Sequence, residues 1–357
     1  MKVLSIIIPT YNMAALLPRC LNSLITAANA ELLEAIVVND GSRDNSLEIA
    51  ERYRMQYPDV ITVIDKPNGN YGSTVNAALP LAKGRYVKIL DSDDYFSTAM
   101  LDRLLETLRD TDADMVVTPF TEHDPKGQMQ VIRYNTMGRE PYKYGKLYRL
   151  DDILPDGHIR FFLMHALTYR TDLLRSMNYR QTEGISYTDT EWASLPTYYA
   201  QTIMFLNYNV YQYNFDRAGQ TMDPAVLMKS LGQLEQVLDS IIDYYRLHRD
   251  ELSAVRRDWE KLYLEGRLKN FYKLYLLDMP RRQFSVQEMS RIDDKYSAAC
   301  QELGLQVKLY PENKLLRIEY ISYWHRHHRR WPVWLEWINH QIDEVARYFY
   351  KKFIRNK

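Results

Sequence analysis

Cysteine is scarce in this chain of 357 residues, which has only Cys20 and Cys300, far apart in helix-like stretches. Structural disulfides are therefore not expected, and the composition fits a reducing cytoplasm. An excess of charge of one sign is also missing, because 46 Lys and Arg balance 46 Asp and Glu. A neutral chain has no general attraction to nucleic acid, so nucleic acid is not an expected partner.

Long apolar runs are missing as well. No run approaches the length that crosses a bilayer, and the opening apolar run, residues 4–8, is too short for a signal peptide and is needed as a strand. There is no internal repeat and no low-complexity linker. We therefore expect a large soluble protein, with room for a core of over roughly 200 residues and an appendage.

Short apolar strands alternate with helical stretches in the first third of the chain. This alternation predicts an α/β fold with a mostly parallel central sheet. The expected strands are residues 4–8, where Pro9 stops the run, 35–39, 60–64, 86–90 and 114–118, and the expected helices are 14–28, 45–57, 73–83 and 99–109.

The most informative segment is the apolar run 86–90 with the carboxylates that follow it, Asp91, Asp93 and Asp94. Carboxylates crowded at a strand end repel one another unless a cation lies among them. Because the cluster contains neither Cys nor His, it favours a hard divalent ion, magnesium or manganese, and such ions usually hold a diphosphate. The alternative is an Asp-rich turn that caps the next helix, since Asp94 and Ser97 are good N-cap residues.

Two other expected strands also end in polar residues. Tyr11 and Asn12 follow the first strand, and Asp40, Gly41 and Ser42 follow the second. In parallel sheets, ligands bind beyond the carboxyl ends of the strands. We therefore expect a single ligand site along this edge of the sheet.

Four segments carry a resemblance to a known family. Residues 5–12 (SIIIPTYN), 38–46 (VNDGSRDNS), 68–76 (NGNYGSTVN) and 91–94 (DSDD) resemble the motifs of family 2 glycosyltransferases, in that family's order and spacing. The resemblance extends over about residues 3–120. It implies the GT-A fold and a transferase that uses a nucleotide-diphosphate sugar and inverts the anomeric centre.

The resemblance implies that Asp40 reads the nucleotide base or ribose, because a carboxylate accepts hydrogen bonds from an imide NH or from hydroxyls. Gly41 would let the backbone approach the nucleotide closely. The Asn68–Gly72 loop is expected to curl around phosphate or ribose, although two glycines alone more often serve a turn. Nucleotide contacts are predicted for Pro9, Tyr11, Asn12, Asp40, Gly41, Lys66, Gly72, Asn76, Asp91 and Ser92.

Within the acidic cluster, the resemblance implies that Asp93 is the main metal ligand and that Asp91, the second, lies nearer the ribose. Asp94 would replace either of them or only cap a helix, and this choice stays open. The expected cofactor is Mn²⁺ or Mg²⁺, which would stabilise the charge that develops on the departing diphosphate.

An inverting transfer also needs a general base for the acceptor hydroxyl. Segment 183–192 resembles the family's acidic motif at a helix start, usually Glu-Asp, although Thr188 replaces the Glu. The match makes Asp189 the predicted base and Glu191 the alternate. A carboxylate at a helix N-terminus is favoured electrostatically in any case, so a purely capping role for Asp189 stays open.

Two further residues have two interpretations each. Arg217 lies in segment 210–221, which resembles the strand and loop that close many of these domains. A guanidinium there would reach the diphosphate, because it matches phosphate oxygens well, or it is an ordinary surface residue. His165 lies in an apolar stretch and is either a core histidine or, since the resemblance places this region towards the acceptor, a functional one.

We predict a catalytic domain over residues 1–223, with nucleotide-sugar binding in 1–120 and the acceptor side and base in 121–223. Apolar residues at helical spacing predict a C-terminal helical extension over 224–322. The tail, 323–357, has eight Lys and Arg against three Asp and Glu, and an apolar stripe that predicts an amphipathic helix on a membrane surface. Packing on the catalytic domain and dimerisation are the alternatives. The stripe consists of Trp334, Ile338, Ile342, Val345 and Phe349.

The predicted activity is the inverting transfer of one sugar, with uridine the expected base of the donor. The acceptor would be a glycan or a lipid-linked molecule in surface-polysaccharide synthesis, in the cytoplasm or on the inner face of the membrane. The membrane spans and Gln-x-x-Arg-Trp motif of processive members of the family are missing, which favours single addition. A nucleotidyltransferase is disfavoured, because Pro-Thr-Tyr-Asn replaces a Gly-rich, Arg-containing loop after the first strand. A non-catalytic sugar-nucleotide binder or scaffold remains the second hypothesis.

Overall fold

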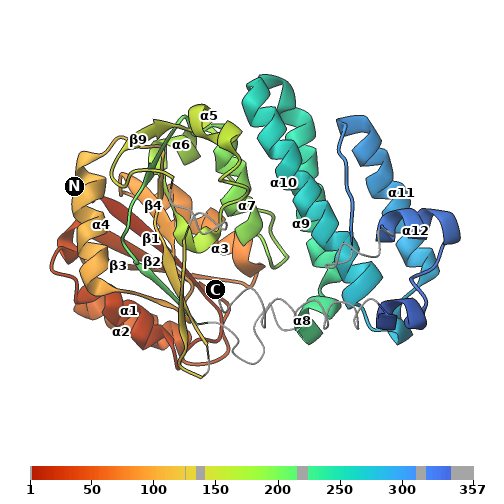
Figure 1. Ribbon diagram of the computed structural model, residues 1–357. Helices are drawn as coiled ribbons and strands as arrows, with labels where there is room; N and C mark the ends of the chain where they lie inside the picture. The colour runs from red at the N-terminus through yellow and green to blue at the C-terminus, as the bar shows by residue number, and fades with distance from the viewer. Residues whose placement is uncertain (1, 125, 134–140, 215–223, 311–318, 339–357) are drawn as a thin grey trace, which may run out of the picture. The chain divides into compact units, whose positions relative to one another are not determined.

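The computed structural model (Figure 1) describes residues 2–124, 126–133, 141–214, 224–310 and 319–338. The chain divides into two compact units, Met1–Trp259 and Glu260–Lys357. Each unit is described by itself, and the predicted catalytic motifs all fall in the first.

The first unit is built on an eight-stranded sheet of order β3-β2-β1-β4-β10-β6-β11-β9. Strands β1 to β4 are parallel and β11 is parallel to β6, whereas β10 and β9 run against their neighbours. The predicted mostly parallel sheet is therefore confirmed. Its strands are β1 Leu4–Thr10, β2 Leu33–Asp40, β3 Ile61–Lys66, β4 Tyr86–Ile89, β6 Met115–Val117, β9 Leu147–Arg149, β10 Leu167–Arg170 and β11 Thr202–Phe205.

The prediction that Pro9 stops the first strand is wrong, because β1 continues to Thr10 and pairs Pro9 with Val38 of β2. Proline lacks the N–H that a central strand normally uses. Ile7 bonds towards β4 through its carbonyl, which accepts from the Leu90 amide, and Pro9, two residues on, points to the same side. Because β4 pairs with β1 only as far as Ile7, the missing N–H of Pro9 breaks no ladder bond.

Helices follow these strands as predicted, with small shifts at their ends. In α4 the buried residues Leu101, Leu104, Leu105 and Leu108 recur at helical spacing, so one face of the helix packs on the core. The third helix ends five residues before the predicted end, because Pro80 cannot continue it. The helices of this region are α1 Leu17–Ile25, α2 Ser46–Gln56, α3 Asn70–Ala78 and α4 Thr98–Asp110.

A second sheet of four strands, order β5-β12-β7-β8, was not predicted. Strand β12 pairs antiparallel with β5, directly after the acidic cluster, and parallel with β7. The sheet thereby brings residues more than 100 positions later in the chain beside Asp94. Its strands are β5 Tyr95–Phe96, β7 Phe120–His123, β8 Met129–Ile132 and β12 Tyr211–Asn214.

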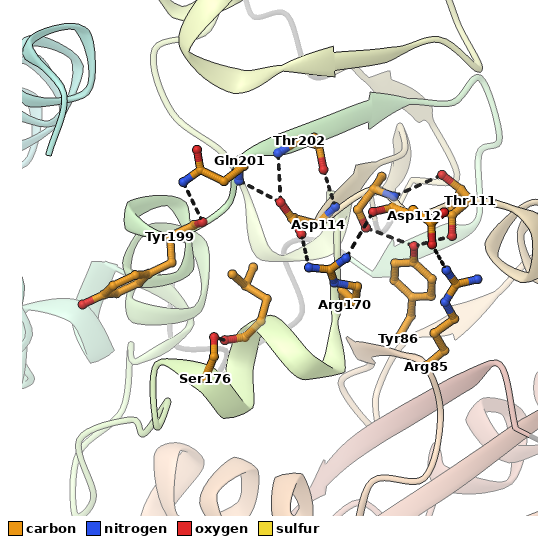
Figure 2. A network of polar contacts seen from close by, with 12 residues as sticks. Arg85, Tyr86, Thr111, Asp112, Asp114, Arg170, Ser176, Tyr199, Gln201 and Thr202 are labelled. Carbon is orange, nitrogen blue, oxygen red and sulfur yellow. Dashed lines mark hydrogen bonds and ion pairs between the residues drawn. The ribbon is translucent and has the colours of Figure 1, made fainter.

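A polar network secures β6, β10 and β11 (Figure 2). The buried carboxylate of Asp114 accepts from the amides of Gln201 and Thr202 at 2.8 and 3.0 Å and pairs with Arg170 at 2.6 Å. Nearby, the Tyr86 hydroxyl donates to backbone carbonyls after α4. A buried carboxylate with this set of donors stabilises the strands it joins, so we assign the network to the fold rather than to chemistry.

The rest of the first unit is mainly helical, and α9 belongs to it. Gln233 Oε1 accepts from the Ser186 amide at 2.9 Å, and Tyr244 packs edge-on against Tyr198 at 5.0 Å. The predicted boundary at residue 223 would instead place α9 in a separate extension. These helices are α5 Leu150–Ile153, α6 Thr171–Ser176, α7 Asp189–Ser194, α8 Pro224–Lys229 and α9 Leu231–His248.

The second unit is a set of helices around a buried carboxylate. Asp293 accepts from Tyr272 at 2.8 Å and from the Trp324 indole at 3.1 Å, and it lies 3.0 Å from His325. Within the described residues, no helix is long and apolar enough to cross a membrane. The helices are α10 Ala254–Lys273, which starts in the first unit, α11 Val286–Leu303 and α12 Tyr320–His327, and short 3-10 or π turns lie at Ala30–Leu32, Leu79–Leu81, Leu154–Asp156, Met164–Ala166, Leu195–Tyr198, Arg249–Glu251, Leu274–Asp278 and Arg281–Gln283.

Candidate active site

The three strand ends that the sequence singled out lie along one edge of the central sheet. Strands β2, β1 and β4 are neighbours and run in the same direction, so their carboxyl ends meet there. The loop after β1 is tied to the one after β2: the Asn12 amide donates to Ser42 at 3.0 Å, and Asn12 Oδ1 accepts from the Arg43 amide at 2.8 Å. Tyr11 remains 42% exposed at this edge, which leaves its ring accessible to a planar ligand.

Asp40, the last residue of β2, is almost fully buried and has a cationic partner. Its Oδ1 lies 2.6 Å from Lys66 Nζ and accepts from the Gly69 amide at 2.9 Å. Lys66 also donates to Ser73 at 2.8 Å, so it joins β2 to α3. Gly41 follows at a φ of +71°, and an added Cβ would lie 3.0 Å from the Asn68 amide nitrogen. A side chain there would thus be strained by both its backbone and its surroundings.

The acidic cluster after β4 is held by hydroxyls and amides instead. Asp91 accepts from the Tyr71 hydroxyl at 2.9 Å. Asp94 accepts from the Tyr211 hydroxyl and the Asn214 amide, both at 2.8 Å. Within the described residues, neither Asp91 nor Asp94 forms an ion pair. Ser92, between them, is buried. The structure thus shows Asp94 bonded into β12, which favours a structural role for it.

The carboxylates of this cluster raise one another's pKa. Burial, the Asp93 charge and the Asp189 charge raise the pKa of Asp91 to about 7, against the lowering effect of the Tyr71 bond. Burial and the charges of Asp93 and Asp91 raise the pKa of Asp94 well above its usual range. Ionising both carboxyls is therefore unfavourable without a compensating charge, and a divalent cation would favour their charged forms. This donor set fits the ion that the sequence predicted.

His165 lies beside the cluster. One of its ring nitrogens and carboxylate oxygens of Asp91 and Asp94 all lie within 4.8 Å of one another. Its ring packs against Phe120, Tyr211 and Tyr213, at centroid distances of 4.9, 4.8 and 4.5 Å. Burial and then the Lys88 ammonium lower the pKa of His165 to about 3, so the imidazole is neutral near pH 7.

A clamp, defined here as residues 181–184 with their partners on the loop before α3 and on α3 itself, joins the nucleotide side to the predicted base. Asn76 Nδ2 donates to the Gln181 carbonyl at 2.8 Å and to Glu183 at 2.9 Å, and Asn76 Oδ1 accepts from the Gln181 amide at 2.8 Å. A Cβ on Gly72 would lie 2.1 Å from the Thr182 carbonyl oxygen. Gly72 and Asn76 therefore have a structural role in the clamp. Direct contact between either residue and a nucleotide stays a prediction.

The two candidate bases differ in accessibility. Glu191 is 1% exposed, and its two oxygens accept from the Thr182 amide and hydroxyl, both at 2.7 Å. Through these two bonds to Thr182, Glu191 supports the clamp. Asp189 begins α7, is partly exposed, and its charge acts on both Tyr71 and Asp91. Asp189 is therefore near enough to act electrostatically on the acidic cluster.

Sequence reasoning missed Tyr71, Tyr211, Asn214 and Lys88. Lys88 is buried inside β4, and its Nζ donates to the carbonyls of His165 and Leu167 at 2.7 and 3.0 Å. A lysine inside an apolar strand was the one available signal for it, since such a charge needs buried acceptors. Tyr211 and Asn214 lie in segment 210–221, whose resemblance to a strand was noted, but the pairing that brings this strand beside Asp94 was not predicted. Arg217 lies outside the described residues.

Comparisons with known proteins agree with this geometry. The family model described as "Glycosyl transferase family 2" matches residues 5–176. An uncharacterized glycosyltransferase of Mycoplasma pneumoniae, the MG060 homolog, is 29% identical over 262 residues, which are 71% of this chain and 81% of that protein. Chondroitin synthase of Pasteurella multocida is 37% identical over 134 residues, 37% of this chain but only 14% of the synthase.

Solved structures support the fold. A crystal structure of S. aureus TarS has a TM-score of 0.61 and 22% identity, covering 85% of this chain and 82% of that chain. A structure of S. aureus TarS in complex with UDP has a TM-score of 0.59 and 19% identity, covering 92% and 88%. At such identities the likeness concerns the fold alone.

Proposed function

Because this chain belongs to glycosyl transferase family 2, whose model matches residues 5–176, we propose that it transfers one sugar from a UDP-sugar, with inversion, to a glycan or lipid-linked acceptor. The proposed setting is the synthesis of a surface polysaccharide. Chondroitin synthase is a relative over part of its length, and the similarly folded TarS has been solved with UDP. These similarities support the class of donor and of product. The support for the nucleotide contacts, the metal ligands and the base comes from the geometry of the site.

The nucleotide would bind along the β1–β2 edge. The Asp40 carboxylate, which Lys66 and the Gly69 amide hold in one orientation, would accept from the base or ribose. The exposed ring of Tyr11 would stack on the base. Gly41 lies so close to Asn68 that an added Cβ would be 3.0 Å from the Asn68 amide nitrogen, so a larger residue would displace this loop.

The diphosphate would lie at Asp91 and Asp93, which we propose as the ligands of Mn²⁺ or Mg²⁺. The raised pKa of Asp91, caused by burial and by neighbouring carboxylates, supports a bound cation there. When bound, the ion would act as a Lewis acid that stabilises the departing diphosphate. Tyr71 and Tyr211 hold the carboxylates of Asp91 and Asp94 in place.

Asp189 would take the proton from the acceptor hydroxyl while that oxygen attacks the anomeric carbon from the face opposite the diphosphate. The bond between the anomeric carbon and the diphosphate breaks as the new glycosidic bond forms, in an in-line displacement without a sugar–enzyme intermediate. A positioned general base contributes about 10²–10⁴-fold to such a reaction. Glu191, by fixing Thr182, would keep the base segment in register with α3.

One observation carries the proposal: Asp189, from the start of α7, lies near enough to the β4 carboxylates for its charge to raise the pKa of Asp91. Only folding brings together these residues, which are far apart in the sequence. The test is a panel of sugar nucleotides with Mn²⁺ or Mg²⁺, scored for binding and for slow hydrolysis to the free diphosphate. Asp93→Ala and Asp189→Ala are measured in parallel.

We expect metal-dependent binding of one donor that is lost in Asp93→Ala. Asp189→Ala should still bind the donor but should lose turnover by about 10²–10⁴-fold. A correctly folded protein that binds no sugar nucleotide would instead support the non-catalytic scaffold. Equal turnover by Asp189→Ala and the wild type would remove Asp189 as the base.

A second proposal concerns the tail: residues 323–357 would bind an anionic membrane surface, where a lipid-linked acceptor lies. Its described part supports this, because Val333, Trp334 and Trp337 are each 62% exposed while Trp331 and Leu335 are buried. The remaining stripe residues, Ile342, Val345 and Phe349, lie outside the described residues. Co-sedimentation with vesicles containing anionic lipid tests the proposal. Trp334→Ser with Trp337→Ser should reduce binding, and an unchanged bound fraction would contradict it.

A further inference from the structure

His165 is a half-buried side chain at the edge of the acidic cluster, and one of its ring nitrogens is unexplained. Its Nδ1 is buried and has no hydrogen-bond partner within the described residues. An imidazole nitrogen left without a partner in a folded core costs free energy, so it calls for an explanation. One of its ring nitrogens lies within 4.8 Å of a carboxylate oxygen of Asp91 and of one of Asp94.

The surroundings of His165 fix its position firmly. Rings of Phe120, Tyr211 and Tyr213 pack around the imidazole at 4.5 to 4.9 Å. The buried Lys88 Nζ donates to the carbonyl oxygen of His165 itself, at 2.7 Å, and so fixes the backbone that carries the ring.

We propose that His165 supplies an imidazole nitrogen to the divalent cation held by the β4 carboxylates, and that this ligand makes the site prefer Mn²⁺ to Mg²⁺. The proposal rests on the metal site of the proposed function and adds a residue and a metal preference to it. The acidic cluster alone predicted oxygen ligands only, because it contains no histidine and His165 lies more than 70 positions away in the sequence.

The spacing and chemistry of the donors both support this. Bonds of about 2.0–2.2 Å from one ion to two ligands leave the donor atoms about 3–4.4 Å apart. The His165 nitrogen and the Asp91 oxygen, which lie within 4.8 Å of each other, therefore need only a small contraction to share an ion. Imidazole suits transition metals, and affinities rise from Mn²⁺ along the first-row series, whereas Mg²⁺ prefers carboxylate and water oxygens. A nitrogen ligand therefore favours manganese even where both ions fit the carboxylates.

The experiment is electron spin echo envelope modulation of Mn²⁺ bound to the full chain, first with the metal alone and then with UDP. A directly coordinated ¹⁴N gives a characteristic modulation that oxygen ligands do not. We expect this modulation in the wild type and its replacement by the ¹⁵N pattern when histidine alone is ¹⁵N-labelled. His165→Gln should abolish it, while His158→Gln, which changes a histidine outside the cluster, should retain it.

The second measurement compares dissociation constants for Mn²⁺ and Mg²⁺ by competition. His165→Gln should weaken Mn²⁺ binding by about 10-fold or more and leave the dissociation constant of Mg²⁺ nearly unchanged. The preference of the site for Mn²⁺ over Mg²⁺ should therefore become smaller. Because the labelling experiment uses the wild type, the proposal can be tested even if His165→Gln fails to fold. Bound Mn²⁺ without nitrogen modulation would overturn the inference and leave the proposed function intact. No Mn²⁺ binding under any condition would overturn both.

Discussion

Two strand ends of the same sheet carry buried carboxylates, and the protein treats them differently. At the end of β2, Asp40 has a permanent cation, because Lys66 Nζ lies 2.6 Å away and adds further bonds to Ser73 and the Pro67 carbonyl. At the end of β4, Asp91 and Asp94 receive hydrogen bonds from neutral groups only, among the residues that the structure describes. The first carboxylate is neutralised by the chain, whereas the second pair has no cationic partner among the described residues.

Under the proposed function, this difference would separate donor recognition at Asp40 from chemistry at the acidic cluster. A carboxylate paired with lysine keeps its charge and orientation whether or not a ligand is present, which suits the reading of a base or ribose. Carboxylates that repel one another raise each other's pKa and lose stability until a cation binds. Catalytic sites commonly hold such strain, and here it would be relieved only when the cation arrives.

The largest effect on stability is expected from Lys66→Met. This change leaves the Asp40 carboxylate buried without its cation, and breaking a buried pair in this way costs about 3 kcal/mol of unfolding free energy. Chemical denaturation measures it. The double variant Asp40→Asn with Lys66→Met should recover much of the loss, because no unpaired charge remains. A loss in Lys66→Met below about 0.5 kcal/mol would show that the two strand ends do not differ as described.

Asp91→Asn should change the free energy of unfolding in the opposite direction. Without metal, the substitution removes one of the mutually repelling charges and should stabilise the protein by about 1 kcal/mol. It should also reduce the increase in melting temperature that Mn²⁺ gives the wild type, since binding to the native state alone stabilises it by mass action. Thermal unfolding with EDTA and with Mn²⁺ measures both effects. If metal-free Asp91→Asn is less stable than the wild type, the lost hydrogen bonding of the carboxylate outweighs the relief of repulsion.

The smallest effect is expected from Tyr71→Phe, which removes the hydroxyl that donates to Asp91 at 2.9 Å. Because the pKa of Asp91 is raised to about 7, the acceptor is only partly charged at neutral pH, and the hydrogen bond is worth about 1 kcal/mol net. Tyr53→Phe is the matched control, because its hydroxyl donates to the amide oxygen of Asn22 on a more exposed surface. Equal losses in the two variants, measured by denaturation, would mean that the Asp91 contact has no special weight.

The sequence predicted the part of the fold that is built from local signals. Apolar runs ending in polar residues gave β1, β2, β3, β4 and β6 in order, because a buried parallel strand needs a continuous apolar segment. Helix ends were less predictable, as Pro80 shows. The second sheet was missed, since β5, β7, β8 and β12 have two to four residues each and pair across long stretches of chain.

The candidate site was predictable to the same extent. Asp40, Asp91 and Asp93 stand at strand ends, where the chain order alone places them at one edge. The partners that define their charge state, Tyr71, Tyr211 and Asn214, depend on tertiary contacts. The clamp roles of Glu191 and Asn76 were invisible for the same reason, because each side chain finds its partner only when residues 181–184 pack on α3.

The clamp has a consequence for how this enzyme can change. Gly72 leaves no room for a side chain beneath the Thr182 carbonyl, and the Gly184 amide donates to the Gly69 carbonyl at 2.8 Å. Residues 68–76 and the segment 181–191, which contains Asp189, are therefore packed together as one structural unit. Exchanging either one alone for the corresponding segment of a relative should misfit the other, so chimaeras ought to transplant residues 68–76 and 181–191 together. Variants that use new acceptors would then be sought by changing other loops while these two segments are kept unchanged.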